Sequence, residues 1–266
     1  EQSKFDTNPF FNSLWKEMRW EDKIFGIPVN TVSYALFYNK EIFKEVGIDT
    51  LPKTWDDVKR ISKKINRFNS KGYLERVGYL PNYGNLKTSN IIAWQLGHEY
   101  LDEQGAINLS SKEMKDSFLW IKSFIHEIGL KRVLELMGTF GTGLQHGFIS
   151  GKVSMMILDS SYPEIIEKYK PDFQYGVIPI PSYGDSKPIS SAGIWWLGIP
   201  RGVKDPKKSW DFISFLAGEK NQIDYQKRTE GSLFSANKYV AYQENSVSIP
   251  YYDVFLYMLE NSKSPN

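Results

Sequence analysis

The sequence predicts an α/β fold, because runs of strand length alternate with segments of helical periodicity. Four short apolar runs have the length of strands, and they cover residues 34–38, 153–158, 175–178 and 194–199. The segments between them carry apolar residues at helical spacing and have start and stop signals at their ends. The chain has 266 residues, of which 41% are hydrophobic, and this is enough to bury a core. Strands that alternate with helices predict substantially parallel sheets.

A first helix is predicted to begin at Trp55. Thr54 precedes it as a capping residue, and Asp57 stands at the third helical position, which gives an acidic variant of the capping box. The apolar residues that recur at helical spacing are Trp55, Val58, Ile61 and Ile65. We therefore expect one buried stripe and a lysine-rich outer face.

Two further helices have clear boundaries in the sequence. One starts after Ser110 and Ser111 and ends at Gly129. Its expected buried stripe is Met114, Phe118, Ile121, Ile125 and Ile128. The other has Asp205 as its cap and Pro206 at its first position. It runs through Trp210, Ile213 and Leu216 and ends before Gly218.

Composition argues against several kinds of partner. The 33 basic and 31 acidic residues leave a formal charge of +2, with the lysines scattered, so we expect no nucleic-acid partner. The absence of cysteine removes disulfides, thiolate metal sites and cysteine nucleophiles. The three histidines lie far apart and are not spaced for zinc, so no metal site and no cofactor are expected. No apolar run reaches the ~20 residues of a membrane span, and the first residues lack a signal-peptide pattern.

Catalytic motifs are weak in this sequence. The glycine-rich stretch at residues 138–143 lacks a following Gly-Lys-Ser/Thr, and a helical segment rather than a strand precedes it. The Gly-x-Ser-x-Gly elbow of serine hydrolases does not occur. No pair among the acidic residues is singled out as acid and base. A glycoside hydrolase therefore stays an alternative without nominated catalytic residues.

The residues that stand out lie at the ends of predicted strands. Asp159 and Tyr162 follow the run at 153–158, at the carboxyl end of a strand, where α/β sheets bind ligands. Trp195 and Trp196 lie side by side at the start of another run. In a strand they point to opposite faces, so one can be core while the other stacks on a ligand. We nominate Trp195 as the ligand-facing one.

Several stretches match one family pattern in order. The pattern Gly-x-Pro … Tyr-Asn-Lys-x-x-Phe-x-x-x-Gly … Pro-x-Thr-Trp is met at Gly26, Pro28, Tyr38, Asn39, Lys40, Phe43, Gly47, Pro52, Thr54 and Trp55. Residues 148–156 are similar to Phe-x-x-Gly-Lys-x-Ala-Met, and residues 193–213 are similar to a Gly-Gly-Trp … Ile-Pro-Lys segment. The chain thus resembles the extracytoplasmic solute-binding proteins of ABC importers, in their sugar-binding, maltose-binding-protein-like class.

The resemblance implies a two-lobed, periplasmic-binding-protein-like fold of the class II type, with the ligand cleft between the lobes. Residues 1–30 and 194–240 would form the first lobe, and residues 34–189 and 241–266 the second. Crossings near residues 30–33 and 190–194 would act as hinges and lie within reach of ligand and solvent. The usual chain has further βα units before the point that matches Phe11, on the order of 100 residues, and helices after the point that matches Asn266. We therefore expect the first lobe to be incomplete here.

The resemblance also implies a function without catalysis. The protein would capture a mono- or oligosaccharide in the cleft and deliver it to the membrane permease subunits of an ABC transporter. It would be a monomer outside the cytoplasm, in the periplasm or as a cell-surface lipoprotein. Receptors for other solutes remain alternatives: a polyamine would need several carboxylates in the cleft, an anion a basic cluster, and ferric iron adjacent tyrosines.

The candidate ligand residues follow from this reading. Aromatic faces for sugar rings are expected from Tyr34, Trp94, Tyr162 and Trp195. Hydrogen bonds to hydroxyls are expected from Ser33, Asn90, Gln95 and Asp159. Gly193 would serve backbone geometry, and Ser232 lies in a loop where the family usually has Gly-x-Leu-Pro. Trp94 could instead be helix core, Tyr34 lobe packing and Asp159 a helix cap, while Asn82 and Tyr83 have a weaker claim.

Overall fold

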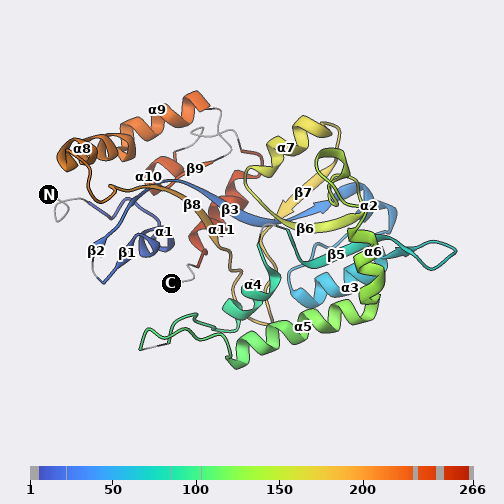
Figure 1. Cartoon of the computed structure of the whole chain (residues 1–266). Coiled ribbons are helices and arrows are strands. Elements are labelled where there is room, and N and C mark those ends of the chain that lie inside the picture. Colours follow the sequence, from blue (N-terminus) through green and yellow to red (C-terminus); the bar gives the residue numbers. More distant parts are fainter. Residues whose placement is uncertain are drawn as a thin grey trace.

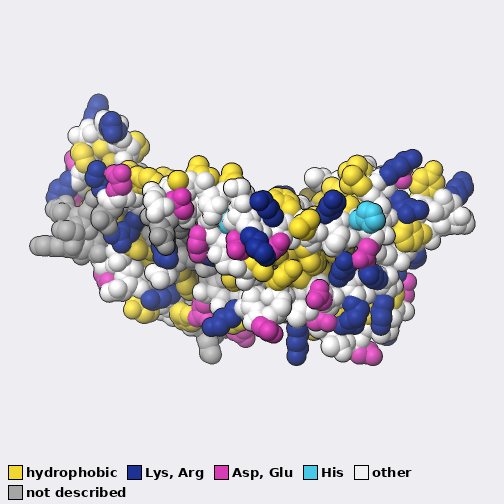
Figure 2. Space-filling view, turned by 90° about the horizontal axis from the view of Figure 1, so that it is seen from below, with side chains coloured by type: hydrophobic (Ala, Val, Ile, Leu, Met, Phe, Trp, Pro, Cys, Tyr) yellow, Lys and Arg dark blue, Asp and Glu magenta, His cyan; other side chains and the backbone are white. Residues whose placement is uncertain are grey.

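The computed structural model describes residues 6–21, 23–84, 86–102, 104–229, 233–243 and 249–263. They form two α/β bodies that are joined by one long strand, β3 (Ile27–Asn39), which runs through both (Figure 1). Seen from below, the upper outline of the molecule is hollowed between the bodies (Figure 2). No helix in these ranges is both long and apolar enough to span a membrane.

Strand β3 is shared by two sheets. Its first part pairs with β8 (Ala192–Leu197) and β9 (Phe234–Ser235), and its last part pairs with β6 (Val153–Asp159) and β7 (Tyr175–Ile178). The change of partner falls between Ser33, opposite Ala192, and Tyr34, opposite Asp159. The polar residues before this point do not interrupt the strand.

The expectation that the polar crossing residues reach solvent is wrong. Asn30, Thr31 and Ser33 are all buried. Thr31 explains one of these positions, because its Oγ1 donates to the carbonyl of Gly193 on β8 at 2.9 Å. A buried hydroxyl that makes such a bond avoids a desolvation cost of ~1–3 kcal/mol.

The larger body, called here the β6 body, is built on the sheet order β4-β5-β6-β3-β7, with β4 (Arg67–Phe68) and β5 (Leu74–Gly84). Only one pair among its described strands, β5 with β6, is parallel. The expectation of substantially parallel sheets is therefore wrong. The reason is that β3 enters from the other body and runs against both of its neighbours.

Helices of the β6 body confirm the local signals in the sequence. They are α2 (Lys40–Glu45), α3 (Trp55–Ile65), α4 (Thr88–Gln95), α5 (Lys112–Ile128), α6 (Leu130–Met137) and α7 (Tyr162–Tyr169), with a 3₁₀ turn η2 (Gly143–Gln145). Helix α3 has the predicted capping box of Thr54 and Asp57 and buries the predicted stripe.

Helix α5 has the predicted boundaries but a different buried stripe. Ser111 caps it and Gly129 follows it with a φ of 95°, a conformation that favours glycine. Its buried residues are Met114, Ser117, Trp120, Phe124 and Ile128. Phe118, expected in the stripe, is more than half exposed. The aromatic rings Trp120 and Phe124 occupy the inner face because they pack against Trp55 and Tyr79.

The smaller body, called here the β8 body, surrounds the other part of β3. It contains α1 (Asn12–Glu17), β1 (Arg19–Trp20), β2 (Lys23–Ile24), α8 (Pro206–Ala217), α9 (Glu219–Thr229) and α10 (Lys238–Ala241), beside β8 and β9. Helix α8 starts as predicted: the Asp205 side chain accepts a hydrogen bond from the Lys208 amide and Pro206 follows the cap.

Helix α11 (Tyr252–Glu260) packs against β3 and touches both bodies. Phe255 lies 5.9 Å from Phe37 between ring centroids, and Tyr252 lies 5.0 Å from Phe234. The residues after α11 bind the segment before β8, since the Ser190 amide donates to the Asn261 carbonyl and the Lys263 amide donates to the Ser190 carbonyl. The crossing is thus covered on one side by a helix.

Candidate functional site

One face of the crossing collects several of the predicted ligand residues. Residues directly opposite in an antiparallel pair point to the same side of a sheet. Tyr34 is opposite Asp159, and Asn30 is opposite Trp195. Because Asn30 and Tyr34 are an even number of residues apart on β3, all four side chains lie on the same face. We call Asn30, Tyr34, Asp159 and Trp195 the crossing face.

Gly193 lies opposite Val32 on the crossing strand β3 and next to the Tyr34 hydroxyl. A Cβ atom at Gly193 would be 3.4 Å from the Tyr34 hydroxyl and 2.8 Å from a Val32 methyl carbon. The lack of a side chain at Gly193 therefore makes room for Val32, and the Tyr34 hydroxyl lies at contact distance from the same position. Burial, with a further contribution from the Asp159 charge, raises the pKa of the Tyr34 phenol, so Tyr34 is a neutral hydrogen-bonding group at neutral pH.

Asp159 ends β6 and shapes the turn into α7. Its Oδ1 accepts a hydrogen bond from the Ser161 amide at 2.9 Å and another from the Ser161 hydroxyl at 2.5 Å. These bonds fix the carboxylate beside Tyr34, at the carboxyl end of a strand. Asp159 thus has the local role of a turn residue, and its carboxylate also lies close enough to act on two neighbouring phenols.

Tyr162 is buried and belongs to an aromatic cluster, and its ring also packs edge-on against Phe37, which points to the face of β3 opposite Tyr34. Its ring lies 5.2 Å from His146, which lies 6.1 Å from Tyr83, and Tyr83 lies 5.1 Å from Phe140, all between ring centroids. Burial raises the pKa of Tyr162, and the Tyr83 and Asp159 groups add to the effect. Burial also lowers the pKa of His146, so its imidazole is neutral at neutral pH. We call Tyr83, Phe140, His146 and Tyr162 the aromatic cluster.

Trp195 and Trp196 point to opposite faces of β8, yet neither is core. Trp195 is 49% exposed and Trp196 is 52% exposed. The sequence allowed one of the two to be core, but among the described residues both stay about half exposed. Trp195 lies on the crossing face beside Asn30, whereas Trp196 lies opposite Pro28 and fills the space beside Gly26 and Gly198.

Two predicted ligand residues lie in the core of the β6 body. Gln95 uses both ends of its amide: its oxygen accepts from the Trp55 indole at 2.9 Å and its nitrogen donates to the Pro181 carbonyl at 2.9 Å. Trp94 is buried on α4 and its ring packs edge-on against Tyr100. Neither side chain joins the crossing face, so the site defined here leaves them out.

The remaining predicted residues are less directly placed. Ser33 is buried and points to the face opposite Tyr34, where its neighbour on the same side, Thr31, is paired with Phe234. Asn90 is half-buried on α4, and its side-chain oxygen lies 3.5 Å from the Ser89 hydroxyl. Ser232 lies outside the described residues.

The aromatic cluster contains residues that the sequence did not nominate. Phe140 lies within the glycine-rich stretch at residues 138–143 and His146 lies just after it, both between α6 and β6. Tyr83 lies at the end of β5, the strand parallel to β6, so it meets Tyr162 at the same sheet edge. The ends of neighbouring parallel strands could have signalled Tyr83; no local signal marks Phe140 or His146.

The site offers hydrogen-bonding groups and aromatic faces. The crossing face supplies one carboxylate, one phenol, one amide and one exposed indole. No group of three or more metal-binding side chains occurs among the residues that the structure describes. Two α/β bodies that share one long strand have the architecture of a two-lobed binding-protein fold. The chain belongs to the bacterial extracellular solute-binding proteins, whose family model matches residues 3–223.

Curated relatives agree with this family and are longer than the chain. A binding protein of Brucella abortus is 26% identical over 205 residues, which cover 74% of this chain and 47% of the relative. The sn-glycerol-3-phosphate-binding periplasmic protein UgpB of Brucella melitensis is 26% identical over 257 residues, which cover 92% of this chain and 56% of the relative. The chain spans about half the length of these relatives.

Solved structures share the two-lobed fold. CpMnBP1 with mannobiose bound aligns with a TM-score of 0.83 at 24% identity, over 99% of this chain and 68% of that chain. The same protein with mannotriose bound aligns with a TM-score of 0.71 at 28% identity, over 82% and 57%. Maltose-bound MalE3 of T. maritima aligns with a TM-score of 0.72 at 19% identity, over 99% and 68%.

Proposed function

We propose that the protein is a receptor that binds a neutral mono- or oligosaccharide at the crossing face, without chemical turnover. One observation carries the proposal: Tyr34, Asp159 and the exposed Trp195 share one face at the junction of the two bodies. An indole stacks on the apolar face of a sugar ring, and a carboxylate accepts hydrogen bonds from hydroxyls. Together these groups match the two kinds of surface that a sugar presents.

The buried amide of Asn30 supports the same proposal. Its Nδ2 is buried without a hydrogen-bond partner among the described residues, and it lies on the crossing face. An unsatisfied buried donor costs ~1–3 kcal/mol, and a ligand hydroxyl on this face would remove that cost. The names of CpMnBP1 with mannobiose and of maltose-bound MalE3 make these disaccharides the first candidates.

The charge of the site favours a neutral solute over an anionic one. The Asp159 carboxylate acts electrostatically on both Tyr34 and Tyr162. A phosphate placed beside it would meet a like charge, which costs binding energy. The relative named for sn-glycerol-3-phosphate therefore gives a direct contrast, and this solute should bind worse than a disaccharide.

Membership of the family supports a wider setting for this receptor. We propose that the lobes divide at residues 30–33 and 190–194, that closure of the lobes covers the solute, and that the receptor delivers it to an ABC permease outside the cytoplasm. The protein acts as a monomer, in the periplasm or as a lipoprotein at the cell surface. The change of partner strand between Ser33 and Tyr34 supports the first of these boundaries.

The test uses two tryptophans of similar exposure on opposite faces of β8. In calorimetric titrations of the complete polypeptide that carries this sequence, mannobiose and maltose are compared with sn-glycerol-3-phosphate. Trp195→Ala should weaken disaccharide binding about tenfold, the equivalent of 1.4 kcal/mol, whereas Trp196→Ala should leave it unchanged. Asp159→Asn, which keeps an oxygen for the Ser161 bonds, should weaken it ~10- to 100-fold.

Three outcomes would contradict the proposal. The crossing face is not the site if Trp196→Ala weakens binding as much as Trp195→Ala. The sugar assignment fails if neither disaccharide nor any other neutral sugar binds and the phosphate ester does. Release of monosaccharides from mannobiose during the titration would favour the glycoside hydrolase alternative.

A further inference from the structure

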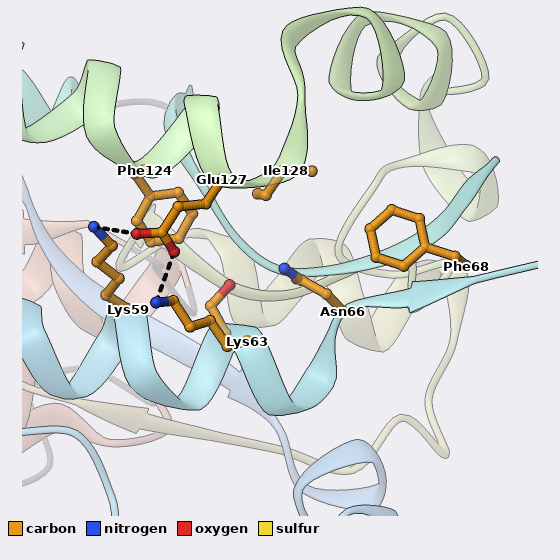
Figure 3. A pocket seen from close by; sticks show the side chains of 8 residues that line it. Lys59, Lys63, Asn66, Phe68, Phe124, Glu127 and Ile128 are labelled. Atoms are coloured by element: carbon orange, nitrogen blue, oxygen red, sulfur yellow. Dashed lines mark ion pairs between the residues drawn. The ribbon is translucent and has the colours of Figure 1, made fainter. Parts of the chain in front are cut away.

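A groove lies between α3 and α5 in the β6 body, and no residue of the crossing face or the aromatic cluster lines it. Its volume is about 230 Å³, smaller than most ligand pockets but larger than the ~150 Å³ that holds a benzene ring. Lys59, Lys63 and Asn66 line one side, Glu127 the other, and Phe68 closes one end (Figure 3). The groove thus combines charged groups with an aromatic ring.

The charged groups of the groove leave an excess of positive charge. Lys59 and Lys63 both bind the single carboxylate of Glu127, at 2.7 and 2.8 Å. Hydrogen bonds from Lys59 and Lys63 lower the pKa of Glu127, so the carboxylate stays ionised at neutral pH. Two ammonium groups against one carboxylate attract a second anion.

Arg132 adds a further cation at the end of the groove. Its guanidinium lies 5.5 Å from the centroid of the Phe68 ring, and it donates to the carbonyls of Gly72 and Ile128. These bonds hold the cation in place beside the ring, in the geometry of a cation–π contact. Arg132 does not itself line the groove, but its charge lies beside Phe68, which does.

The inner surface of the groove is apolar. Phe124 and Ile128 are both buried on α5 and form its floor, and Phe68 is 44% exposed. Asn66 uses its side-chain oxygen to accept from the Gly78 amide at 2.9 Å, so its amide nitrogen is the end that can serve the groove. An occupant would bury an apolar body against these rings and direct its polar end to Lys63 and Asn66.

The surroundings reinforce the positive charge. Residues 53–76 contain eight lysines and arginines but only three acidic residues, although the whole chain has a formal charge of only +2. Lysine and arginine side chains are visible around this body in the view from below (Figure 2). The three arginines among them are paired with carboxylates, Arg60 with Asp57, Arg67 with Glu75 and Arg76 with Glu45, so the excess comes from the lysines. A net positive excess near a groove raises the local concentration of ligands of opposite charge.

We propose that this groove is a second binding site, distinct from the crossing face, and that it takes a small organic carboxylate with a flat apolar body. The carboxylate accepts hydrogen bonds from Lys63 and from the amide nitrogen of Asn66. The ring of the ligand packs against Phe68 and the floor of the groove. Neither the charge nor the ring suffices alone.

The test compares three probes that separate these contributions. Benzoate carries both a charge and a ring, benzyl alcohol keeps the ring without the charge, and acetate keeps the charge without the ring. In titrations of the complete ¹⁵N-labelled polypeptide, benzoate should shift the amide signals of Lys63, Asn66, Phe68 and Glu127 along one saturable curve. Benzyl alcohol and acetate should each bind at least about tenfold more weakly.

A neighbouring lysine provides the matched control. Lys63→Gln removes a cation from the groove and should weaken benzoate binding ~5- to 10-fold. Lys64→Gln removes the same charge from the next residue of α3, which is exposed and outside the groove lining, and should change binding less than twofold. Both lysines are exposed, so both variants should fold, and circular dichroism checks this.

Each contrary result overturns the proposal in its own way. Equal binding of benzyl alcohol and benzoate would reduce the groove to an apolar slot. Equal binding of acetate and benzoate, or an equal loss in Lys63→Gln and Lys64→Gln, would reduce it to general surface charge. Absence of any shift at the four amides would show that no carboxylate of this class binds there.

Discussion

On the β6 body the rings of Trp55, Tyr79 and Phe148 are fully buried, whereas on the β8 body those of Trp20, Phe25 and Phe212 are more than half exposed. The two bodies share β3 and have similar aromatic residues available. In the β6 body, helices cover both faces of a five-stranded path. In the β8 body, the described strands and helices leave many rings open. Burial is therefore a property of the layers around a residue as much as of the residue.

Helix α8 illustrates this difference most clearly. Ile213 and Ala217 are buried against the β8 body, but Phe212 and Phe215 on the other side are exposed. A helix that is apolar on two sides is typical of a position between two layers. The described residues provide one of these layers. The comparison predicts that equal aromatic substitutions have unequal effects in the two bodies.

The largest expected difference is in stability. Phe37 is fully buried and contacts Phe148, Tyr162, Tyr175 and Phe255. Phe37→Ala should lower the free energy of unfolding by ~3–5 kcal/mol, because it leaves a cavity. Phe212→Ala should change it by less than ~0.5 kcal/mol. Urea unfolding measures both, and similar losses would break the comparison.

A smaller difference is expected at the helix caps. Hydrogen bonding to Arg60, followed by bonds from the Lys53 and Thr54 amides, lowers the pKa of Asp57 to about 2. Its stabilising effect is therefore present above its ordinary pKa of 3.8 and is lost as the pH falls towards 2. Asp57→Asn should cost ~1 kcal/mol at pH 7 and much less near pH 2.

The variant for comparison in the β8 body is Asp205→Asn, which changes the cap residue itself rather than the third helical position. Asparagine caps a helix about as well as aspartate, so this variant should cost only a few tenths of a kcal/mol at pH 7. The free energy of unfolding of both variants is measured at pH 7, 4 and 2. A loss in Asp57→Asn that does not shrink on acidification would show that its carboxylate is not what stabilises α3.

The smallest effect on stability is expected for exposed aromatic residues, which allow the surfaces of the two bodies to be compared. Phe212→Ser with Phe215→Ser should leave stability nearly unchanged but lower the fluorescence of a bound hydrophobic dye, since these rings belong to an open apolar face. Phe118→Ser with Leu119→Ser removes two exposed apolar residues of α5 in the β6 body and is the control. An equal loss of fluorescence would mean that both bodies present similar apolar faces.

Local signals in the sequence predicted local structure well. Thr54 and Asp57 predicted the start of α3, and Asp205 and Pro206 predicted the start of α8. Gly129 predicted the end of α5. These signals act through hydrogen bonds within a few residues, so the sequence contains the whole interaction. The pairing of strands could not be predicted in this way. β3 is antiparallel to β6 and β7 because it enters their sheet from the other body, and no signal within a few residues records that.

The candidate site was predictable only in part, for the same reason. Asp159 and Tyr162 follow a predicted strand, and they were nominated because ligands of α/β proteins bind at the carboxyl ends of strands. Helix α4 contains Ile91, Ile92 and Ala93 before Trp94 and is buried nearly all round. Its hydrophobic pattern therefore could not predict whether Trp94 and Gln95 point to the core or to a ligand. The partners of Gln95 come from Trp55 and Pro181, which are 40 and 86 residues away in sequence.

The shared strand β3 also makes the two bodies sensitive to the parity of any insertion between them. Side chains of a strand alternate with a period of two, so an extra residue after Ser33 would turn everything beyond it to the opposite face. Tyr34 would then point away from Trp195 while each body kept its own ladder of hydrogen bonds. Two extra residues would return these side chains to their original face and would only lengthen the strand between the two bodies. Binding should therefore tolerate an even change in this segment better than an odd one.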